Sequence, residues 1–174
     1  MFFIDLETER LILKNISMDD REFVFSHFSD SEVNKYLFDT EPVTDMQGAD
    51  EIVEFYLKPE PRSWHRWIII RKDDGMKMGT CGVHLWDQKE HKVEVGYDLS
   101  KEFWGKGYMQ EAMKEVISFA TDKMKVKEIT ACIYVDNERS MNLAENLGFV
   151  LKDTNYELYR NKKYLHHKYS LCIQ

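Results

Sequence analysis

A short loop with two glycines, Gly105 and Gly107, joins a strand pattern to a helix pattern in the second half of the chain. A glycine loop that enters a helix presents backbone N–H groups at the positive end of the helix dipole, where phosphate or pyrophosphate binds without a dedicated basic residue. Lys106 adds a positive charge between the glycines. The spacing is neither G-x-G-x-x-G nor that of a P-loop. A tight strand-to-helix turn explains the two glycines equally well.

Two polar residues at the start of a later predicted helix form the second group that could do chemistry. Asn137 follows a strand pattern and is a favoured N-cap residue, and Ser140 comes three residues later. Both side chains are expected beside the end of the preceding strand, a place that suits a ligand lying against strand ends. Helix capping alone would explain Asn137, and an ordinary first-turn serine would explain Ser140.

The elements that must position these residues follow from hydrophobic periodicity. Residues 92–99 alternate apolar and polar side chains, which predicts a strand, and residues 108–123 repeat apolar side chains at helical spacing. Thr44 with Gln47 resembles a capping box at the start of an earlier helix. The complete pattern predicts a mixed α/β sheet domain. Further strands are expected at 10–14, 65–70, 76–86, 128–135 and around a turn at 161–162, and further helices at about 17–27, 44–58 and 137–147.

Cysteine usage and apolar run length argue against several classes of protein. Cys81, Cys132 and Cys172 form no CxxC pair, so neither a disulfide scaffold nor a common zinc site is indicated. Each lies in a strand-like apolar run, which predicts buried, reduced thiols in a cytoplasmic protein. The apolar runs, such as residues 67–70, are far too short for a membrane span. The acidic N-terminal segment lacks the features of a signal peptide.

Charge is unevenly distributed along the chain. Residues 1–60 carry 15 acidic and 5 basic side chains, whereas the rest carries 16 acidic and 19 basic ones, within a net charge of −7. An extended nucleic-acid groove needs a concentrated basic face, so this balance disfavours nucleic-acid binding. The length fits one domain over residues 1–174. The sequence leaves the oligomeric state open, with a homodimer as one alternative.

Three segments together resemble the GNAT superfamily of N-acetyltransferases: ETERLILKNISMDD, EVGYDLSKEFWGKGYMQEAM and VDNERSMNLAENLGF. The first is similar to the branch of ribosomal-protein N-terminal (alanine/serine) acetyltransferases. The resemblance covers nearly the whole chain in one collinear order. It implies a mixed, mostly antiparallel sheet of about seven strands with a V-shaped split, flanked by about four helices. It also implies direct transfer of an acetyl group from acetyl-CoA to an amine, with no metal.

The resemblance assigns the donor site residue by residue. The pyrophosphate loop corresponds to Trp104, Gly105, Lys106, Gly107, Tyr108 and Met109, where Met109 replaces the usual small residue. The strand end whose backbone pairs with the pantetheine arm corresponds to Tyr97, Asp98 and Leu99. Asn137 matches the position that hydrogen-bonds the pantetheine, and Ser140 matches a position near the thioester sulfur.

The resemblance also suggests how protons move. Many family members use as the acid a tyrosine four residues before the glycine of the Leu-Gly-Phe ending, but Ala144 occupies that position and cannot donate. Ser140 is then the candidate donor to the leaving sulfur. Glu94, on the polar side of its strand, is the leading candidate base, acting through a water. An ordinary exposed strand glutamate is the alternative, and His84 is a rival base.

The acceptor is less well defined by the sequence. The resemblance implies an amine that binds near Phe28, Tyr36 and Trp86. Candidates are the N-terminus of a protein such as a ribosomal protein, a polyamine or an aminoglycoside. The acidic first third of the chain favours a positively charged amine. Because Ala144 replaces the usual tyrosine, a catalytically quiet acyl-CoA-binding sensor or interaction module is the alternative function.

Overall fold

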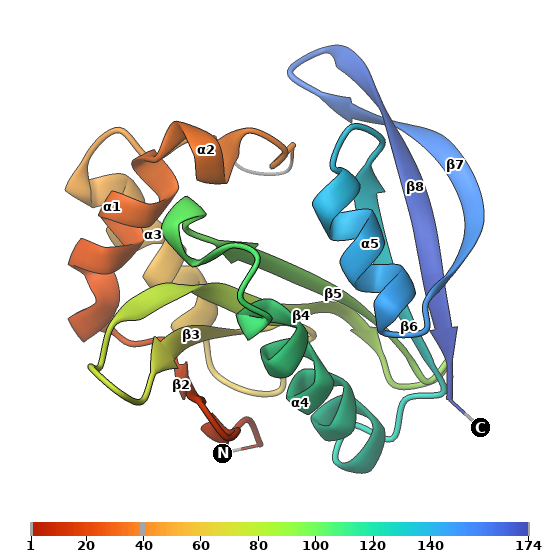
Figure 1. Ribbon diagram of the computed structural model, residues 1–174, viewed down its shortest axis with the longest axis horizontal. Helices are drawn as coiled ribbons and strands as arrows, with labels where there is room; N and C mark the ends of the chain where they lie inside the picture. Colours follow the sequence, from red (N-terminus) through yellow and green to blue (C-terminus); the bar gives the residue numbers. More distant parts are fainter. Residues whose placement is uncertain (1, 39–40, 174) are drawn as a thin grey trace.

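The computed structural model describes residues 2–38 and 41–173, which form one eight-stranded sheet in the order β1-β2-β3-β4-β5-β6-β8-β7 (Figure 1). The strands are β1 (Leu6–Glu7), β2 (Leu11–Asn15), β3 (His65–Arg71), β4 (Lys77–Asp87), β5 (Lys92–Leu99), β6 (Glu128–Tyr134), β7 (Val150–Tyr159) and β8 (Lys162–Cys172). The helices are α1 (Arg21–Ser29), α2 (Ser31–Asn34), α3 (Met46–Leu57), α4 (Tyr108–Asp122) and α5 (Glu138–Asn146), with 3₁₀ turns η1 (Met18–Asp20) and η2 (Lys101–Phe103).

The sheet is antiparallel except at its centre, where β5 and β6 run parallel. These two strands pair from Lys92 opposite Glu128 to Glu94 opposite Thr130. In the part of the chain that the structure describes, their pairing stops there, although β5 continues to Leu99 and β6 to Tyr134. The strand ends therefore separate as the V-shaped split that the resemblance implies.

Two apolar cores lie on the two faces of the sheet, and β3 contributes to both. Trp67 and Ile69 belong to the larger core with α4, whereas Ile68 belongs to the smaller core with α1 and α3. Alternate residues of a strand point to opposite faces, so the apolar run at 67–70 is a strand buried on both sides. Figure 1 shows α4 and α5 in front of the sheet and α3 behind it.

The fold class is confirmed, and the details differ from expectation in four places. The described residues form eight strands and five α-helices, rather than about seven and about four, because β1 and α2 are too short for a periodic signal. The side chain of Asp45, rather than that of Thr44, caps α3 by accepting a hydrogen bond from the Gly48 N–H. Of the three cysteines, all of them free, Cys81 is buried as expected, whereas Cys132 is half-buried and Cys172 is exposed.

No helix among the described residues is long and apolar enough to cross a bilayer. Within residues 2–38 and 41–173, no group of three or more His, Cys, Asp and Glu side chains is placed to hold a metal ion.

Candidate active site

A pocket of about 330 Å³ lies where the ends of β5 and β6 separate. Four parts of the chain line it: the α2 region, the end of β5, the loop before α4, and the first turns of α5. The sequence-predicted residues among its walls are Tyr36, Tyr97, Asp98, Leu99, Trp104, Gly105, Gly107, Tyr108, Met109, Asn137 and Ser140. The structure therefore brings together residues predicted from three separate motifs.

The loop before α4 has the backbone conformation that its glycines allow. Gly105 has φ +72° and Gly107 has φ +78°, so both adopt the left-handed region that glycine occupies without strain. Gly107 is also the N-cap of α4. Because the first N–H groups of a helix lack intrahelical partners, this wall of the pocket can bind an anion. Lys106 does not line the pocket, since its ammonium donates to the Glu102 carbonyl at 2.8 Å.

The opposite wall is the first turn of α5, which is tied to β5. The Asn137 side chain accepts a hydrogen bond from the Ser140 N–H, so Asn137 is the N-cap as expected. The Tyr97 hydroxyl donates to the Ser140 carbonyl oxygen at 3.2 Å. The Ser140 hydroxyl in turn lies 2.9 Å from the Tyr97 hydroxyl. Two hydroxyl groups therefore meet inside the split, one from each wall.

Trp104 connects the loop to both neighbouring elements. Its indole N–H donates to the Leu99 carbonyl at 2.7 Å, which fixes the ring against the end of β5. The Arg139 guanidinium lies over the same ring, 3.3 Å from its centroid, and is a cation–π contact from α5. The sequence predicted Trp104 but not Arg139, because a stack between a loop and a distant helix leaves no periodic signal.

Asp98 presents its backbone and its side chain to different surroundings. Its carboxylate lies 2.6 Å from His27 Nε2 and 3.1 Å from Arg66 Nη1, and it accepts a hydrogen bond from the Thr80 hydroxyl. Burial alone would raise the pKa of the Asp98 carboxyl, but the contacts with His27, Arg66 and Thr80 together lower it. The side chain is therefore committed to structure, which leaves the backbone to contact a ligand.

Comparison with known proteins shows the family. The profile of the acetyltransferase (GNAT) domain matches residues 10–150. The chain belongs to the GNAT acetyltransferase family. It is 34% identical over 146 residues to the uncharacterized N-acetyltransferase p20 of Bacillus licheniformis, a match that covers 83% of this chain and 81% of that protein.

Solved GNAT structures share the fold of this acetyltransferase. One is spermidine N-acetyltransferase from Vibrio cholerae in complex with CoA and spermine, with a TM-score of 0.83, 15% identity, and coverage of 95% of this chain and 96% of that chain. Another is RimL, a ribosomal L7/L12 α-N-protein acetyltransferase in complex with coenzyme A, with a TM-score of 0.86, 15% identity, and coverage of 95% and 96%. The GNAT protein described here is an acetyl-CoA-dependent N-acetyltransferase.

Glu94 lies at the point of this acetyltransferase where the split begins. It is opposite Thr130 in the last pair between β5 and β6 and opposite His84 on β4. Its neighbours Val93 and Val95 belong to the core with α4, so Glu94 faces the other side of the sheet. Burial and the Arg66 charge lower the pKa of His84 to about 3. A group with that pKa accepts protons poorly at neutral pH. Glu94, which is not among the residues that line the pocket, remains the candidate base.

Two of the three residues that the resemblance placed at the acceptor lie away from the pocket. Phe28 is buried in the core with α1 and α3, where Arg66 lies 5.6 Å from its ring. Trp86 is near the end of β4, stacked on Phe2 with 5.2 Å between ring centroids. Both aromatic rings therefore pack against the fold, whereas Tyr36 lines the pocket.

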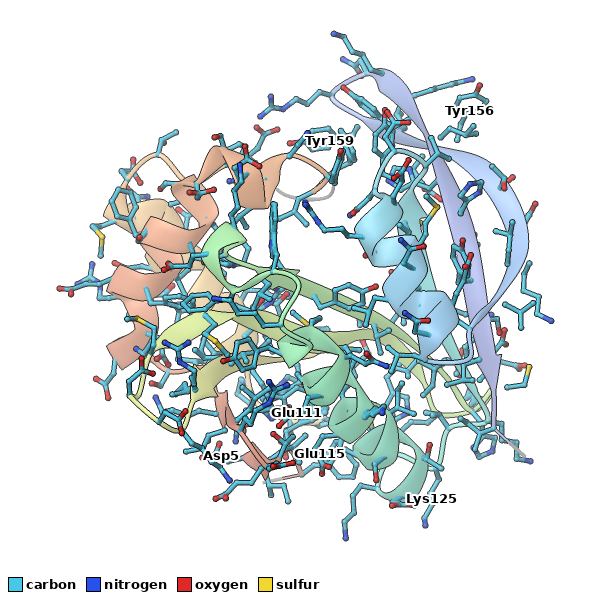
Figure 2. The ribbon with its side chains drawn as sticks, in the orientation of Figure 1. Asp5, Glu111, Glu115, Lys125, Tyr156 and Tyr159 are labelled. Carbon is cyan, nitrogen blue, oxygen red and sulfur yellow. The ribbon has the colours of Figure 1, made fainter. Side chains whose placement is uncertain are left out.

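An aromatic cluster beside Tyr36 was not predicted from the sequence. Tyr134 at the end of β6 lies 5.8 Å from the Tyr36 ring, and Phe38 lies 4.7 Å from Tyr134 and 4.3 Å from Tyr164 on β8. Figure 2 shows Tyr159, another member, directed toward the α2 side of the β7–β8 hairpin. The cluster joins the α2 region to β6, β7 and β8 next to the pocket. Its members are distant in sequence and meet only at the split, so no local pattern predicts it.

Proposed function

We propose that this enzyme transfers the acetyl group of acetyl-CoA to a primary amine by direct attack within a ternary complex. The observation that carries the proposal is the pocket at the split, which places a positive-φ glycine loop and the first turn of α5 on facing walls. One wall offers backbone donors for phosphate, and the other offers a hydroxyl for a developing negative charge. Acetyl-CoA carries both the phosphates and the thioester that these walls suit.

The chain offers a distinct group for each part of the donor. The backbone N–H groups after Gly105 and Gly107 bind the pyrophosphate. The backbone of residues 97–99, which has no strand partner on its β6 side among the described residues, pairs with the pantetheine arm. Asn137 hydrogen-bonds the pantetheine, and Ser140 donates to the sulfur as the C–S bond breaks. When bound, acetyl-CoA supplies an acetyl group activated as a thioester.

We infer that the acceptor is a positively charged amine: the N-terminus of a protein, a polyamine or an aminoglycoside. Two proteins of the same fold are a spermidine acetyltransferase and a ribosomal α-N-protein acetyltransferase, which supports both kinds of amine as candidate substrates. Glu32 and Tyr36 line the α2 side of the pocket, where a carboxylate and an aromatic face suit an ammonium group. Each already has a lysine beside it, Lys101 at 3.5 Å from Glu32 and Lys35 at 5.1 Å from the Tyr36 ring, so a substrate ammonium would compete with these side chains. Glu94 takes a proton from this ammonium through a water before the amine attacks.

A thiol-release assay tests the proposal and names the acceptor class. The protein is incubated with acetyl-CoA and with peptides bearing free N-termini, polyamines or aminoglycosides, and the liberated CoA thiol is titrated. We expect turnover with at least one of these amines and acetylation of that amine by mass. Acetyl-CoA binding without thiol release across the whole panel would instead indicate a quiet acyl-CoA-binding module. We propose the cytoplasm as the site of the reaction.

Replacement of Ser140 by alanine separates catalysis from binding. The hydroxyl stabilises charge that develops on sulfur only as the thioester breaks, so Ser140→Ala should lower kcat at least about tenfold. The Kd of acetyl-CoA, measured by calorimetry, should change little. Asn142→Ala, on the same helix and the same pocket wall, is the comparison variant, and we expect its kcat to stay near that of the wild type. An unaltered kcat in Ser140→Ala would refute the assignment.

A further inference from the structure

The side chain of Tyr97 crosses the split to reach α5. Tyr97 belongs to β5, and its hydroxyl lies 2.9 Å from the Ser140 hydroxyl and donates to the Ser140 carbonyl oxygen at 3.2 Å. Both residues line the pocket. These bonds hold Ser140 from the β5 wall, while Asn137 holds its N–H from the other end. Ser140 is therefore fixed on two sides within the pocket.

The hydroxyl pair can transmit a hydrogen bond in either direction. A separation of 2.9 Å between two hydroxyl oxygens allows either one to be the donor. When the Ser140 proton turns toward a ligand in the pocket, the Tyr97 proton can turn toward the Ser140 oxygen. A chain of two hydrogen bonds polarises each member, so the outer hydroxyl becomes a stronger donor than an isolated serine.

The surroundings of Tyr97 keep its hydroxyl protonated. Burial raises the pKa of Tyr97 to about 12, the hydrogen bond with Ser140 lowers it by less, and the neighbouring Tyr169 phenol raises it by the smallest amount. The phenol is therefore a hydrogen-bond donor throughout the neutral pH range. Ser140 lies in the first turn of α5, where the helix dipole also favours a negative charge.

We propose that Tyr97 is a positioning residue for thiolate departure: it acts through Ser140 and orients the serine proton toward the donor sulfur. The inference rests on the proposed function. In the reaction the amine nitrogen forms a bond to the acetyl carbon, and the C–S bond breaks with its electron pair going to sulfur. The ammonium loses one proton before the attack and the nitrogen loses a second as the C–S bond breaks, and both protons pass through Glu94 and water to the solvent. The Tyr97–Ser140 pair stabilises the thiolate and itself gains or loses no proton.

The first test measures binding without turnover. The affinities of CoA and of desulfo-CoA, which lacks the sulfur, are measured by calorimetry from pH 6 to 9. If the hydroxyl pair stabilises a thiolate, the affinity of CoA relative to desulfo-CoA rises with pH in the wild type. The total rise is about tenfold for each unit by which the thiol pKa of bound CoA lies below that of free CoA. Tyr97→Phe and Ser140→Ala should each flatten this rise. Ser140→Thr, which keeps a hydroxyl, should retain it.

Tyr169→Phe is the matched control. Tyr169 is a buried tyrosine of the same core whose hydroxyl donates to Glu145 on α5 at 3.1 Å and does not line the pocket. The Tyr169→Phe substitution removes a hydroxyl that ties β8 to α5 and that makes no hydrogen bond to Ser140. Its pH dependence should match that of the wild type. Equal flattening in Tyr97→Phe and Tyr169→Phe would show that α5 anchoring alone matters, and would overturn the proposal.

A double-mutant cycle on turnover completes the test. We expect Tyr97→Phe to lower kcat about tenfold with an unchanged Kd for acetyl-CoA, and Tyr97→Phe with Ser140→Ala to be no slower than Ser140→Ala alone. Losses that multiply in the double variant would overturn the inference while leaving the acetyltransferase function intact. Failure of the wild type to bind CoA and to release thiol would overturn the proposed function itself.

Discussion

Asp98 links the two faces of the sheet at the end of β5. Its carboxylate is held by His27 and Arg66 behind the sheet, and the residue also lines the pocket at the split. Gly79 on β4 packs so closely that a Cβ there would lie 2.2 Å from the Asp98 carbonyl oxygen. Breaking a buried ion pair typically costs about 3–5 kcal/mol. The buried carboxylate therefore fixes the strand end on which we expect the pantetheine arm to lie.

Gly107 is the residue whose backbone most directly limits the donor site. Its φ of +78° is strained for any residue with a Cβ, and a Cβ there would lie 3.5 Å from the Arg10 guanidinium. We expect Gly107→Val to lower the affinity for acetyl-CoA by at least about tenfold and to destabilise the fold by about 1–2 kcal/mol. Calorimetry and urea unfolding give the two quantities.

Gly75→Val provides the comparison. Gly75 also has a positive φ, +69°, but it lies in the hairpin between β3 and β4, outside the pocket lining. A similar loss of stability with wild-type acetyl-CoA affinity is expected. If Gly75→Val and Gly107→Val weakened acetyl-CoA binding equally, general destabilisation would explain the effect, and the loop assignment would fail.

At the scale of elements, the N-terminal strands hold the start of α4. Figure 2 shows Glu111 where α4 meets these strands. The Glu111 carboxylate accepts hydrogen bonds from the Thr8 hydroxyl at 2.6 Å and from the Arg10 N–H at 2.8 Å. Arg10 also donates to the Lys106 carbonyl and lies 4.5 Å from the Tyr108 ring. The loop before α4 is therefore held in position by residues near the N-terminus, which are distant from it in sequence.

Glu111→Ala should loosen this connection. Hydrogen bonds to a charged group contribute about 1.5–3 kcal/mol each when buried, and this partly exposed site should lose about 1–2 kcal/mol in urea unfolding. Because Arg10 would lose its partner, the KM for acetyl-CoA should rise severalfold. Glu115→Ala, one turn along the same helix, is the control and should leave this KM unchanged. An unchanged KM in Glu111→Ala would show that the loop holds its shape alone.

Periodicity predicted the long elements and missed the short ones. The alternation at 92–99 and the helical spacing at 108–123 match β5 and α4 within a residue or two. β1 has two residues and α2 has four, so neither completes a repeat. The cap of α3 shifted by one residue because Thr44 and Asp45 are both good caps and only the backbone geometry chooses between them.

Contacts between residues that are distant in sequence are the part of the candidate site that could not be predicted from the sequence. The glycine loop and the Asn137 cap could be read from local spacing, but Tyr97 and Ser140 meet across 43 residues and Arg10 and Glu111 across 101. No local pattern records such pairs. Trp86 shows a second limit: the sequence does not indicate which face of the sheet an aromatic residue on a central strand occupies. In the structure, Trp86 packs under the N-terminal segment.

At the scale of the whole molecule, the uneven charge has a consequence for substrate choice. The acidic residues 1–60 include α2, which lines the acceptor side of the pocket, so a polycation should be attracted to it. We expect the KM for a polyamine to rise severalfold between 0.05 and 0.5 M salt, because salt screens charges beyond about one Debye length. The KM for a monoamine acceptor should rise less.

A pair of charge-neutralising variants separates local from general attraction. Glu32→Gln, in the pocket wall, should raise the polyamine KM, and Glu54→Gln, on α3 and outside the pocket lining, should not. Equal effects would indicate attraction by total charge alone. A polyamine KM that is independent of salt would contradict the cationic acceptor.

Stability should depend on pH through a buried histidine. Burial, with the Arg62 charge, lowers the pKa of His65 from 6.5 to about 3, and its Nε2 lies 2.7 Å from the Asn15 side-chain oxygen. Between these pKa values the unfolded chain binds a proton that the folded protein does not. Stability is therefore lost as pH falls from 6.5 toward 3, by up to about 1.4 kcal/mol per pH unit for this residue. Urea unfolding in His65→Gln should show a shallower dependence, and an identical one would refute this origin.

Trp104 gives the protein an optical property that none of its other indoles shares. It forms part of the pocket wall, with its ring N–H on the Leu99 carbonyl and a guanidinium against its face. Trp64, Trp67 and Trp86 are outside that wall. Indole emission responds to the polarity and charge around the ring, so the fluorescence of this one residue reports whether the pocket is filled. Binding of acetyl-CoA can thus be followed by tryptophan fluorescence, before any bond is broken.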